Sequence, residues 1–111
     1  MEPPFTDSDR LFGEFRRTGD ARALGEVYDR LAPELLGVAL HTTRDPAQAE
    51  DVLQATFVAA IEQAQRFDPE RRVLPWLVGI LANEARKARE RGTRRPDPER
   101  LARSADSSPQ E

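Results

Sequence analysis

Acidic and basic side chains occupy different segments of this chain. These are the groups through which a protein attracts charged partners. Between Asp45 and Gln65 there are four acids and no Lys or Arg. Between Asn83 and Arg95 there are six bases and two acids. The formal net charge of −3 conceals this separation. Opposite charge in two segments indicates two surfaces that meet two kinds of partner.

The acidic segment AEDVLQATFVAA, residues 49–60, has the apolar spacing of an amphipathic helix. Glu50 and Asp51 lie near its start, where negative charge complements the helix dipole. They therefore either stabilise the helix or form a partner-binding face. They do not form an acid–base pair, because adjacent residues of a helix point in different directions.

Phe67 and Asn83 have side chains suited to contact with nucleic-acid bases. Phe67 lies among charged residues beside the Asp68-Pro69 turn, where we expect an exposed ring that can stack on an unpaired base. Asn83 lies about two helical turns after Trp76 and offers both the donor and the acceptor that base-edge readout requires. Trp76 itself is expected in the core.

Positive charge gathers on the last predicted helix, which carries Arg86, Lys87, Arg89 and Arg91. Cations near the end of a helix stabilise it through the dipole. The same cations suit contacts with phosphates, which need positive charge but little exact spacing. The basic run alone does not distinguish a solvated face from a DNA-binding one.

Catalytic, metal-binding and membrane functions lack the residues that they need. The chain has no Cys and a single histidine, His41, and no phosphate-binding glycine loop. We therefore expect no enzyme activity, no cofactor and no metal. The N-terminus lacks the features of a signal peptide, and no apolar stretch is long enough to cross a membrane. We expect a soluble cytoplasmic protein.

Apolar residues recur at helical spacing throughout the chain and predict an all-α fold. A short first helix is expected between Asp7 as its N-cap and Gly19 as its stop. A second helix follows Asp20. Pro33 should kink or split this helix, because proline removes one backbone hydrogen bond.

The third helix has the clearest start, because Asp45 can cap it and Pro46 suits its first position. Residues 66–74 are expected to form a loop, and the fourth helix to run from Pro75 to Gly92.

A single domain accounts for most of the chain. Residues 1–95 are expected to form a compact bundle of three main helices plus the short N-terminal one. Residues 96–111 are dominated by Pro, Asp, Ser and Glu and are expected to be a disordered linker or tail.

Three segments in this order resemble region 2 of sigma-70-family sigma factors, specifically the ECF (extracytoplasmic function) group. The weakest match is GDARALGEVYDRLAPELLGVAL, and the strongest is DPAQAEDVLQATFVAAI. The third is RFDP followed by WLVGILANEARKARERGTRRP. The similarity as a whole runs from about residue 9 to residue 96.

The resemblance implies a role for the acidic segment. In this group the corresponding helix binds the β′ clamp coiled coil of the RNA polymerase core. The positions that fall on the polymerase-binding face are Glu50, Asp51 and Gln54, with Asp45 nearby.

The resemblance also implies contacts with promoter DNA. The positions that would form a pocket for a base flipped out of the non-template strand are Phe67, Ile80 and Asn83. The positions on the helix that meets the promoter backbone are Arg86, Lys87 and Arg89. Such a pocket offsets the cost of opening DNA, about a few kcal/mol per unstacked step.

The chain departs from the family at Gly79 and Ala82, where many relatives carry Arg. A glycine inside a helix costs about 1 kcal/mol relative to Ala, and the missing cations remove phosphate contacts. Promoter binding is expected to be weaker, or distributed onto Arg72, Arg86 and Lys87. The family's second domain, a helix-turn-helix, does not follow, so the chain is either an excised domain or a short factor.

The sequence thus predicts a transcription initiation domain that binds the polymerase clamp and recognises and melts the minus-ten promoter element as single-stranded DNA. Two alternatives remain open at this point. One is a sigma-like interaction module bound by an anti-sigma factor without DNA reading. The other is a helical bundle with no nucleic-acid role.

Overall fold

Helices account for nearly all of the chain that the structure, a computed structural model, describes, namely residues 5–94. The elements are α1 (Asp7–Thr18), α2 (Ala21–Thr43), α3 (Pro46–Glu62), a turn of 3-10 helix η1 (Ala64–Arg66) and α4 (Val73–Arg94). No strand occurs within residues 5–94. The predicted all-α fold is confirmed. The predicted tail, residues 96–111, lies outside the described residues.

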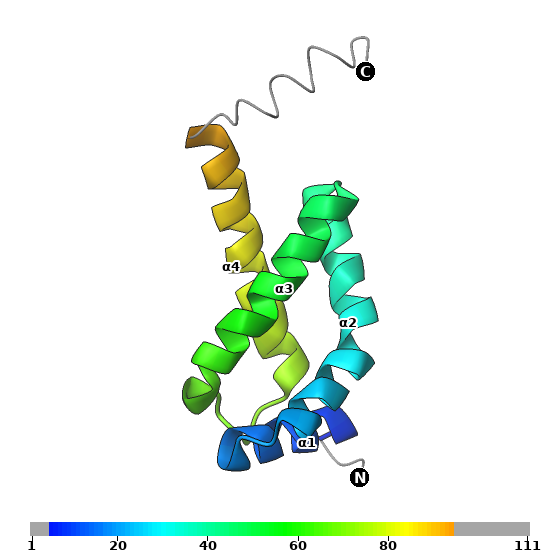
Figure 1. The fold of residues 1–111 in the computed structure, drawn as a ribbon, viewed down its shortest axis with the longest axis vertical. Coiled ribbons are helices and arrows are strands. Elements are labelled where there is room, and N and C mark those ends of the chain that lie inside the picture. Colours follow the sequence, from blue (N-terminus) through cyan, green and yellow to red (C-terminus); the bar gives the residue numbers. More distant parts are fainter. Residues whose placement is uncertain (1–4, 95–111) are drawn as a thin grey trace.

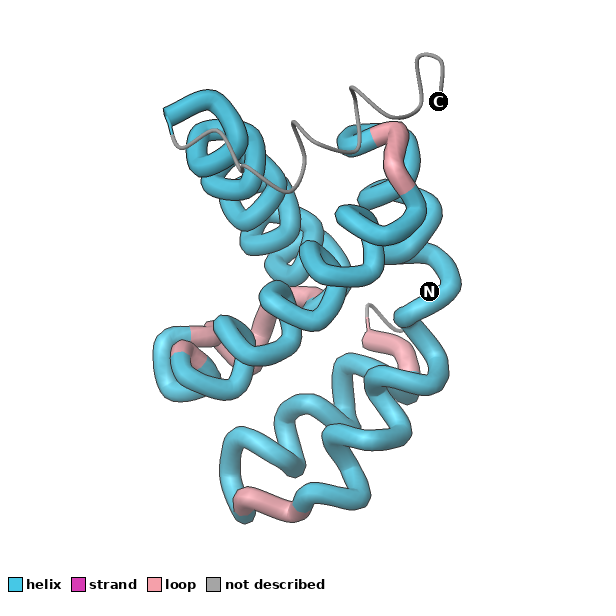
Figure 2. Tube along the Cα trace, turned by 45° about the horizontal axis from the view of Figure 1, so that its top comes forward, coloured by secondary structure: helices cyan, strands magenta, loops and turns pink. Residues whose placement is uncertain are grey.

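The three longer helices pack against one another, and α1 lies across one end of them (Figure 1). The first half of α2 runs back alongside α1, and its second half continues beside α3 (Figure 2). The connection between α3 and α4 returns to the end where α1 lies (Figure 1). Both α3 and α4 keep one side exposed in this arrangement, with Glu50, Asp51 and Gln54 on α3 and Asn83, Arg86 and Lys87 on α4.

Side-chain caps define where the helices begin and end. The second helix starts after Asp20 as predicted, and Asp20 caps it by accepting the backbone N–H of Arg22 at 2.9 Å. The predicted cap of α3 is confirmed by Asp45, which accepts the N–H of Ala47 at 3.1 Å. Gly19 ends α1 in the left-handed conformation, with φ of 75°.

The first helix begins differently from the prediction. Thr6, and not Asp7, is its N-cap, and Thr6 forms a capping box with Asp9. Asp7 lies one residue inside the helix, where its exposed side chain pairs with Arg10 and Arg30. A capping box needs an acceptor on the residue three positions after the N-cap. Asp9 supplies it for Thr6, whereas Arg10, three positions after Asp7, has no acceptor.

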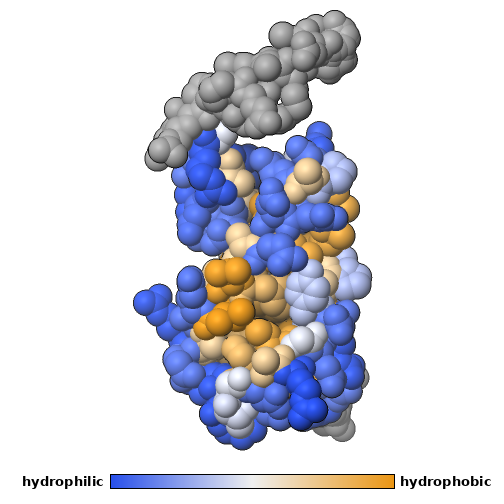
Figure 3. Space-filling model, viewed as in Figure 1, coloured by the Kyte–Doolittle hydropathy of each residue, from blue (hydrophilic) through white to orange (hydrophobic). Residues whose placement is uncertain are grey.

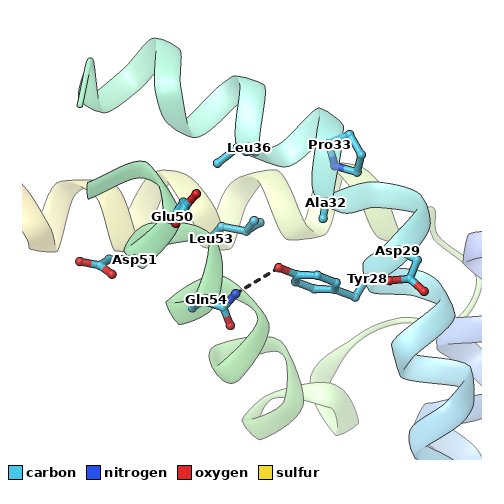
Figure 4. Close-up of a pocket in the computed structure, with 9 residues that line it drawn as sticks. All are labelled: Tyr28, Asp29, Ala32, Pro33, Leu36, Glu50, Asp51, Leu53 and Gln54. Carbon is cyan, nitrogen blue, oxygen red and sulfur yellow. Dashed lines mark hydrogen bonds between the residues drawn. The ribbon is translucent and has the colours of Figure 1, made fainter. Parts of the chain in front are cut away.

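Pro33 lies inside α2, and the helix remains continuous through it. The helix bends at Ala32 and Pro33 without being split (Figure 4). Proline removes one hydrogen bond and crowds the preceding turn, which bends a helix that neighbouring contacts hold together.

The fourth helix starts two residues earlier than predicted, at Val73 instead of Pro75. Proline is tolerated in a first turn because the N–H that it lacks would have no partner within the helix. The helix also continues past the predicted end at Gly92, to Arg94.

The core combines small side chains of α3 with larger ones from the other helices. The largest side chains that are fully buried are Phe12, Leu35, Leu77, Leu81, Val27, Val73 and Thr56. The Thr56 hydroxyl donates to the Val52 carbonyl oxygen at 2.7 Å, so its burial leaves no unmet hydrogen bond. None of the described helices combines the length and apolar character needed to cross a membrane.

Candidate interaction surfaces

A groove of about 620 Å³ lies between α2 and α3. Figure 4 shows the side chains that form it. The described residues that line this acidic groove are Tyr28, Asp29, Ala32, Pro33, Leu36, Glu50, Asp51, Leu53 and Gln54. Its α2 wall is the part of the helix that bends, so the bend at Pro33 shapes the groove.

Three carboxylates and an apolar floor characterise the acidic groove. Asp29 comes from α2, and Glu50 and Asp51 come from the first half of α3. Glu50 and Asp51 diverge from the helix as predicted for neighbours (Figure 4). None of the described lining residues is Lys or Arg. Negative charge around apolar surface suits a partner that presents cations beside apolar side chains.

Gln54 is held in place at the groove by Tyr28. Its amide Nε2 donates to the Tyr28 hydroxyl oxygen at 3.1 Å. The Tyr28 ring packs in turn on Phe57, with ring centroids 4.8 Å apart and an edge-to-face geometry. The contact joins α2 to α3 and fixes the orientation of an exposed polar side chain.

Three of the four residues predicted for polymerase binding meet in the groove, namely Glu50, Asp51 and Gln54. Asp45 does not line it and caps α3 instead. The α2 wall, which includes Tyr28 and Asp29, was not predicted. Helical periodicity shows which residues share one face of a helix but not which second helix lies opposite, so no local signal could have found this wall.

The predicted exposure of Phe67 is wrong. Its side chain is 2% exposed, and its ring packs edge to face on Phe12 at 5.3 Å and against Trp76 at 4.9 Å. The turn η1 directs the chain inward, since the Phe67 N–H donates to the Ala64 carbonyl oxygen at 3.1 Å. The ring is part of the core, and it presents no face to a base in this structure.

The other two residues of the predicted base pocket differ in burial, since one is in the core and the other is exposed. Ile80 is 9% exposed and belongs to the core. Asn83 is exposed on α4, where its side-chain oxygen accepts a hydrogen bond from Arg86. The structure therefore does not form an open pocket from Phe67, Ile80 and Asn83, and of these three only Asn83 is exposed.

Exposed cations line α4 and the loop before it. We call this group the basic face, and its residues are Arg72, Arg86, Lys87 and Arg89. Arg86 pairs with Glu90 at 3.0 Å, and Lys87 pairs with Glu84 at 3.3 Å. Exposed pairs of this kind contribute only about 0–1 kcal/mol, so a phosphate can displace the carboxylates.

Apolar surface gathers over part of α3, whereas the far half of α4 is hydrophilic (Figure 3). Two exposed aliphatic side chains contribute, Val58 at 53% and Ile61 at 47% exposure. They lie on α3 after the acidic residues. Within residues 5–94, no three His, Asp or Glu side chains are placed to hold a metal ion.

The groove and the basic face lie within a segment that matches a known family. The profile of Sigma-70 region 2 matches residues 27–95. The chain belongs to the sigma-70 region 2 family. This confirms the resemblance to region 2 of an ECF sigma factor. Helix α1 precedes the matched segment of this region 2 domain.

Individual sigma factors agree with this family assignment. The chain is 42% identical over 72 residues to the RNA polymerase sigma factor CarQ of Myxococcus xanthus, which covers 65% of this chain and 41% of CarQ. It is 29% identical over 104 residues to the ECF RNA polymerase sigma factor RpoE of Cereibacter sphaeroides, covering 94% of this chain and 58% of RpoE. The region 2 domain thus spans about half the length of these relatives.

A solved structure shares the fold. It is the NMR structure of an engineered region 2 of sigmaE in complex with GTAAAA. The TM-score is 0.74 at 25% sequence identity, and the match covers 87% of this chain and 99% of that one. The family profile matches residues 27–95, whereas the structural match covers 87% of the chain.

Proposed function

We propose that this domain works in transcription initiation by binding the β′ clamp coiled coil of RNA polymerase through the acidic groove. The observation that carries the proposal is the grouping of Glu50, Asp51 and Gln54 with the α2 wall around one apolar floor. A coiled coil buries its a and d side chains between its helices and presents charged side chains at the e and g positions along the outside. A groove with acidic edges is complementary to such an outer surface where its charges are positive, and the apolar floor accommodates the aliphatic stems of Lys or Arg.

We further propose that α4 and the loop before it contact the minus-ten element of promoter DNA as a single strand. The cations of the basic face would contact phosphates, which requires charge but little exact geometry. Asn83 would contact a base edge. The neighbouring region 2 of sigmaE was solved with the short strand GTAAAA, which supports a single-stranded ligand for the same fold.

The burial of Phe67 changes how the DNA site is proposed to work. Phe67 and Ile80 support α4 from the core, and Asn83 projects from its exposed side. Because Arg86 donates to the side-chain oxygen of Asn83, the Nδ2 group would supply the hydrogen-bond donors for a base. Such donors match acceptor atoms on a base edge.

Binding of the domain to an isolated β′ clamp coiled coil tests the first part. Replacing Asp51 with Arg puts a cation into the acidic groove, and we expect the affinity to fall at least about 30-fold, since losing one partner of an interfacial charge pair costs about 2–5 kcal/mol. Glu62→Arg is the matched control, because it makes the same charge change on α3 outside the groove. Equal affinity of Asp51→Arg and wild type contradicts the assignment of the groove.

A second function has support from a specific observation. Phe67 and Ile80, two of the three residues predicted for the base pocket, are buried, so α4 and the loop before it present less to DNA than the sequence predicts. These features favour a module that binds an anti-sigma factor without reading DNA. A single-stranded oligonucleotide containing GTAAAA separates the two, because binding through phosphates must weaken steeply as salt rises.

A further inference from the structure

Helix α1 lies outside the segment that matches the family, yet it contacts the chain that leads into α4. We call residues 64–72 the connecting segment, which comprises η1 and the loop before α4. Figure 1 shows this segment reaching α1 at one end of the bundle. Three side chains of α1 form contacts with the connecting segment or with the first turn of α4, and each comes from a different turn of the helix.

Asp9 forms the first contact. One carboxylate oxygen, Oδ1, accepts the backbone N–H of Val73 at 2.7 Å. The other, Oδ2, accepts the Thr6 backbone N–H at 2.7 Å and its hydroxyl at 3.1 Å. The side chain is 8% exposed. Val73 is the first residue of α4, so its N–H has no partner within the helix. Asp9 supplies that partner from a residue 64 positions earlier.

Phe12 and Arg16 form the other two contacts. The fully buried Phe12 ring packs on Phe67 at 5.3 Å and on Trp76 at 5.4 Å, which places it between the connecting segment and the first turn of α4. Arg16 donates through Nη2 to the Gln65 carbonyl oxygen at 3.2 Å, and the Gln65 amide donates back to the Arg16 carbonyl oxygen at 2.9 Å. Along α1, the contacts of Asp9 and Arg16 are thus polar, and the contact of Phe12 between them is apolar.

We propose that α1 positions the DNA-contacting loop and the start of α4, with Asp9 as the positioning residue. The inference rests on the proposed DNA contact of α4. The first turn of α4 follows Arg72 directly and leads the helix toward Asn83. When Asp9 no longer accepts the Val73 N–H, this turn loses its cap, and Arg72 loses its fixed place relative to Asn83. The acidic groove is built from α2 and α3 and is not expected to change.

Asp9→Asn isolates this role. The amide has nearly the size of the carboxylate, but one of its two acceptor atoms becomes an N–H₂ donor. Because Thr6 donates two hydrogen bonds to Asp9 and Val73 donates one, we expect the remaining oxygen to stay at Thr6, so that the Val73 N–H faces a donor. Asp7→Asn is the matched control, because it makes the same change on the same turn of α1 at an exposed side chain that contacts Arg10 and Arg30.

Three measurements on both variants give the test. For Asp9→Asn we expect hydrogen exchange at the Val73 amide to accelerate at least about tenfold more than at core amides of α3. We expect affinity for a single-stranded GTAAAA oligonucleotide to fall about tenfold and affinity for the clamp coiled coil to stay within about twofold of wild type. Asp7→Asn should leave all three near wild-type values.

Each alternative result has a defined meaning. If Asp9→Asn loses DNA and clamp affinity equally, Asp9 has only a general stabilising role and the proposal is overturned. Unchanged exchange at Val73 overturns it as well. If the wild-type domain does not bind the oligonucleotide, the proposed DNA function fails, and exchange at Val73 alone decides whether α1 positions the loop.

A second variant guards against an unfolded Asp9→Asn protein. Gln65→Ala removes an exposed side chain and the hydrogen bond that it donates to Arg16. We expect it to fold, to speed exchange in residues 66–73 and to weaken oligonucleotide binding about threefold without changing clamp binding. If Gln65→Ala leaves both exchange and oligonucleotide binding at wild-type values, the proposal is overturned.

Discussion

Replacement of Phe67 distinguishes a core residue from a base-stacking one. The structure places its ring between Phe12 and Trp76 with 2% of the side chain exposed. If the ring serves only the core, Phe67→Leu should keep DNA binding, because leucine is apolar and fills most of the same space. If the ring stacks on a base, Phe67→Leu should lose DNA binding while the domain stays folded.

The expected loss of stability follows from the burial. Truncating a buried Phe to Ala costs about 3–5 kcal/mol, and smaller apolar replacements cost less, here about 1–2 kcal/mol. Small domains have unfolding free energies of only about 5–15 kcal/mol. For a domain of this size, each kcal/mol lowers the melting temperature by about 4–8 °C. Phe67→Ala should therefore melt about 12–40 °C below wild type, and Phe67→Leu about 4–16 °C below it.

Circular dichroism during heating gives the melting temperatures, and fluorescence anisotropy with a labelled GTAAAA oligonucleotide gives the affinities. Val58→Ala is the control, because it truncates an aliphatic side chain that is 53% exposed, and it should change the melting temperature by only a few degrees, about 0.5 kcal/mol or less. A folded Phe67→Leu domain that has lost DNA binding would refute the conclusion drawn from burial.

Three further predictions concern α4 and the turn after α1. Gly79→Ala should raise the unfolding free energy by about 1 kcal/mol, because a methyl group there meets no atom within 4 Å and alanine favours the helix. Gly19→Ala should lower the unfolding free energy by about 1–2 kcal/mol, because Gly19 has a φ of 75°, a conformation that a side chain with Cβ disfavours. Urea unfolding of both variants measures whether the two changes in free energy have opposite signs. If the basic face contacts phosphates, replacing both Arg86 and Lys87 with Ala should reduce the slope of log affinity against log salt for the oligonucleotide by about 1.4. An unchanged slope would exclude these two cations from phosphate contact, and Arg30→Ala on α2 is the control.

Much of the local structure follows from short-range signals in the sequence. Asp45 caps α3 and Gly19 ends α1 as predicted, and α2 starts directly after Asp20. These features depend on residues within three or four positions of one another, where backbone geometry alone fixes which groups meet. The separation of acidic α3 from basic α4 is likewise a property of the chain order.

The features that only the tertiary structure decides are those that join distant segments. Phe67 has polar neighbours in the sequence, which predicted exposure, but Phe12 lies 55 residues earlier and covers its ring in the fold. The acidic groove needs an α2 wall that no periodicity within α3 indicates.

Asp9 is the clearest case. Its spacing from Thr6 fits a local capping box, and that pair fully explains why an acid stands there. Its contact with the Val73 N–H exists only because α1 lies across the start of α4. The sequence by itself determines the helices, their caps and the distribution of charge, because these depend on neighbours along the chain. Burial and the pairing of surfaces depend on which helices pack together, because that packing brings together residues tens of positions apart.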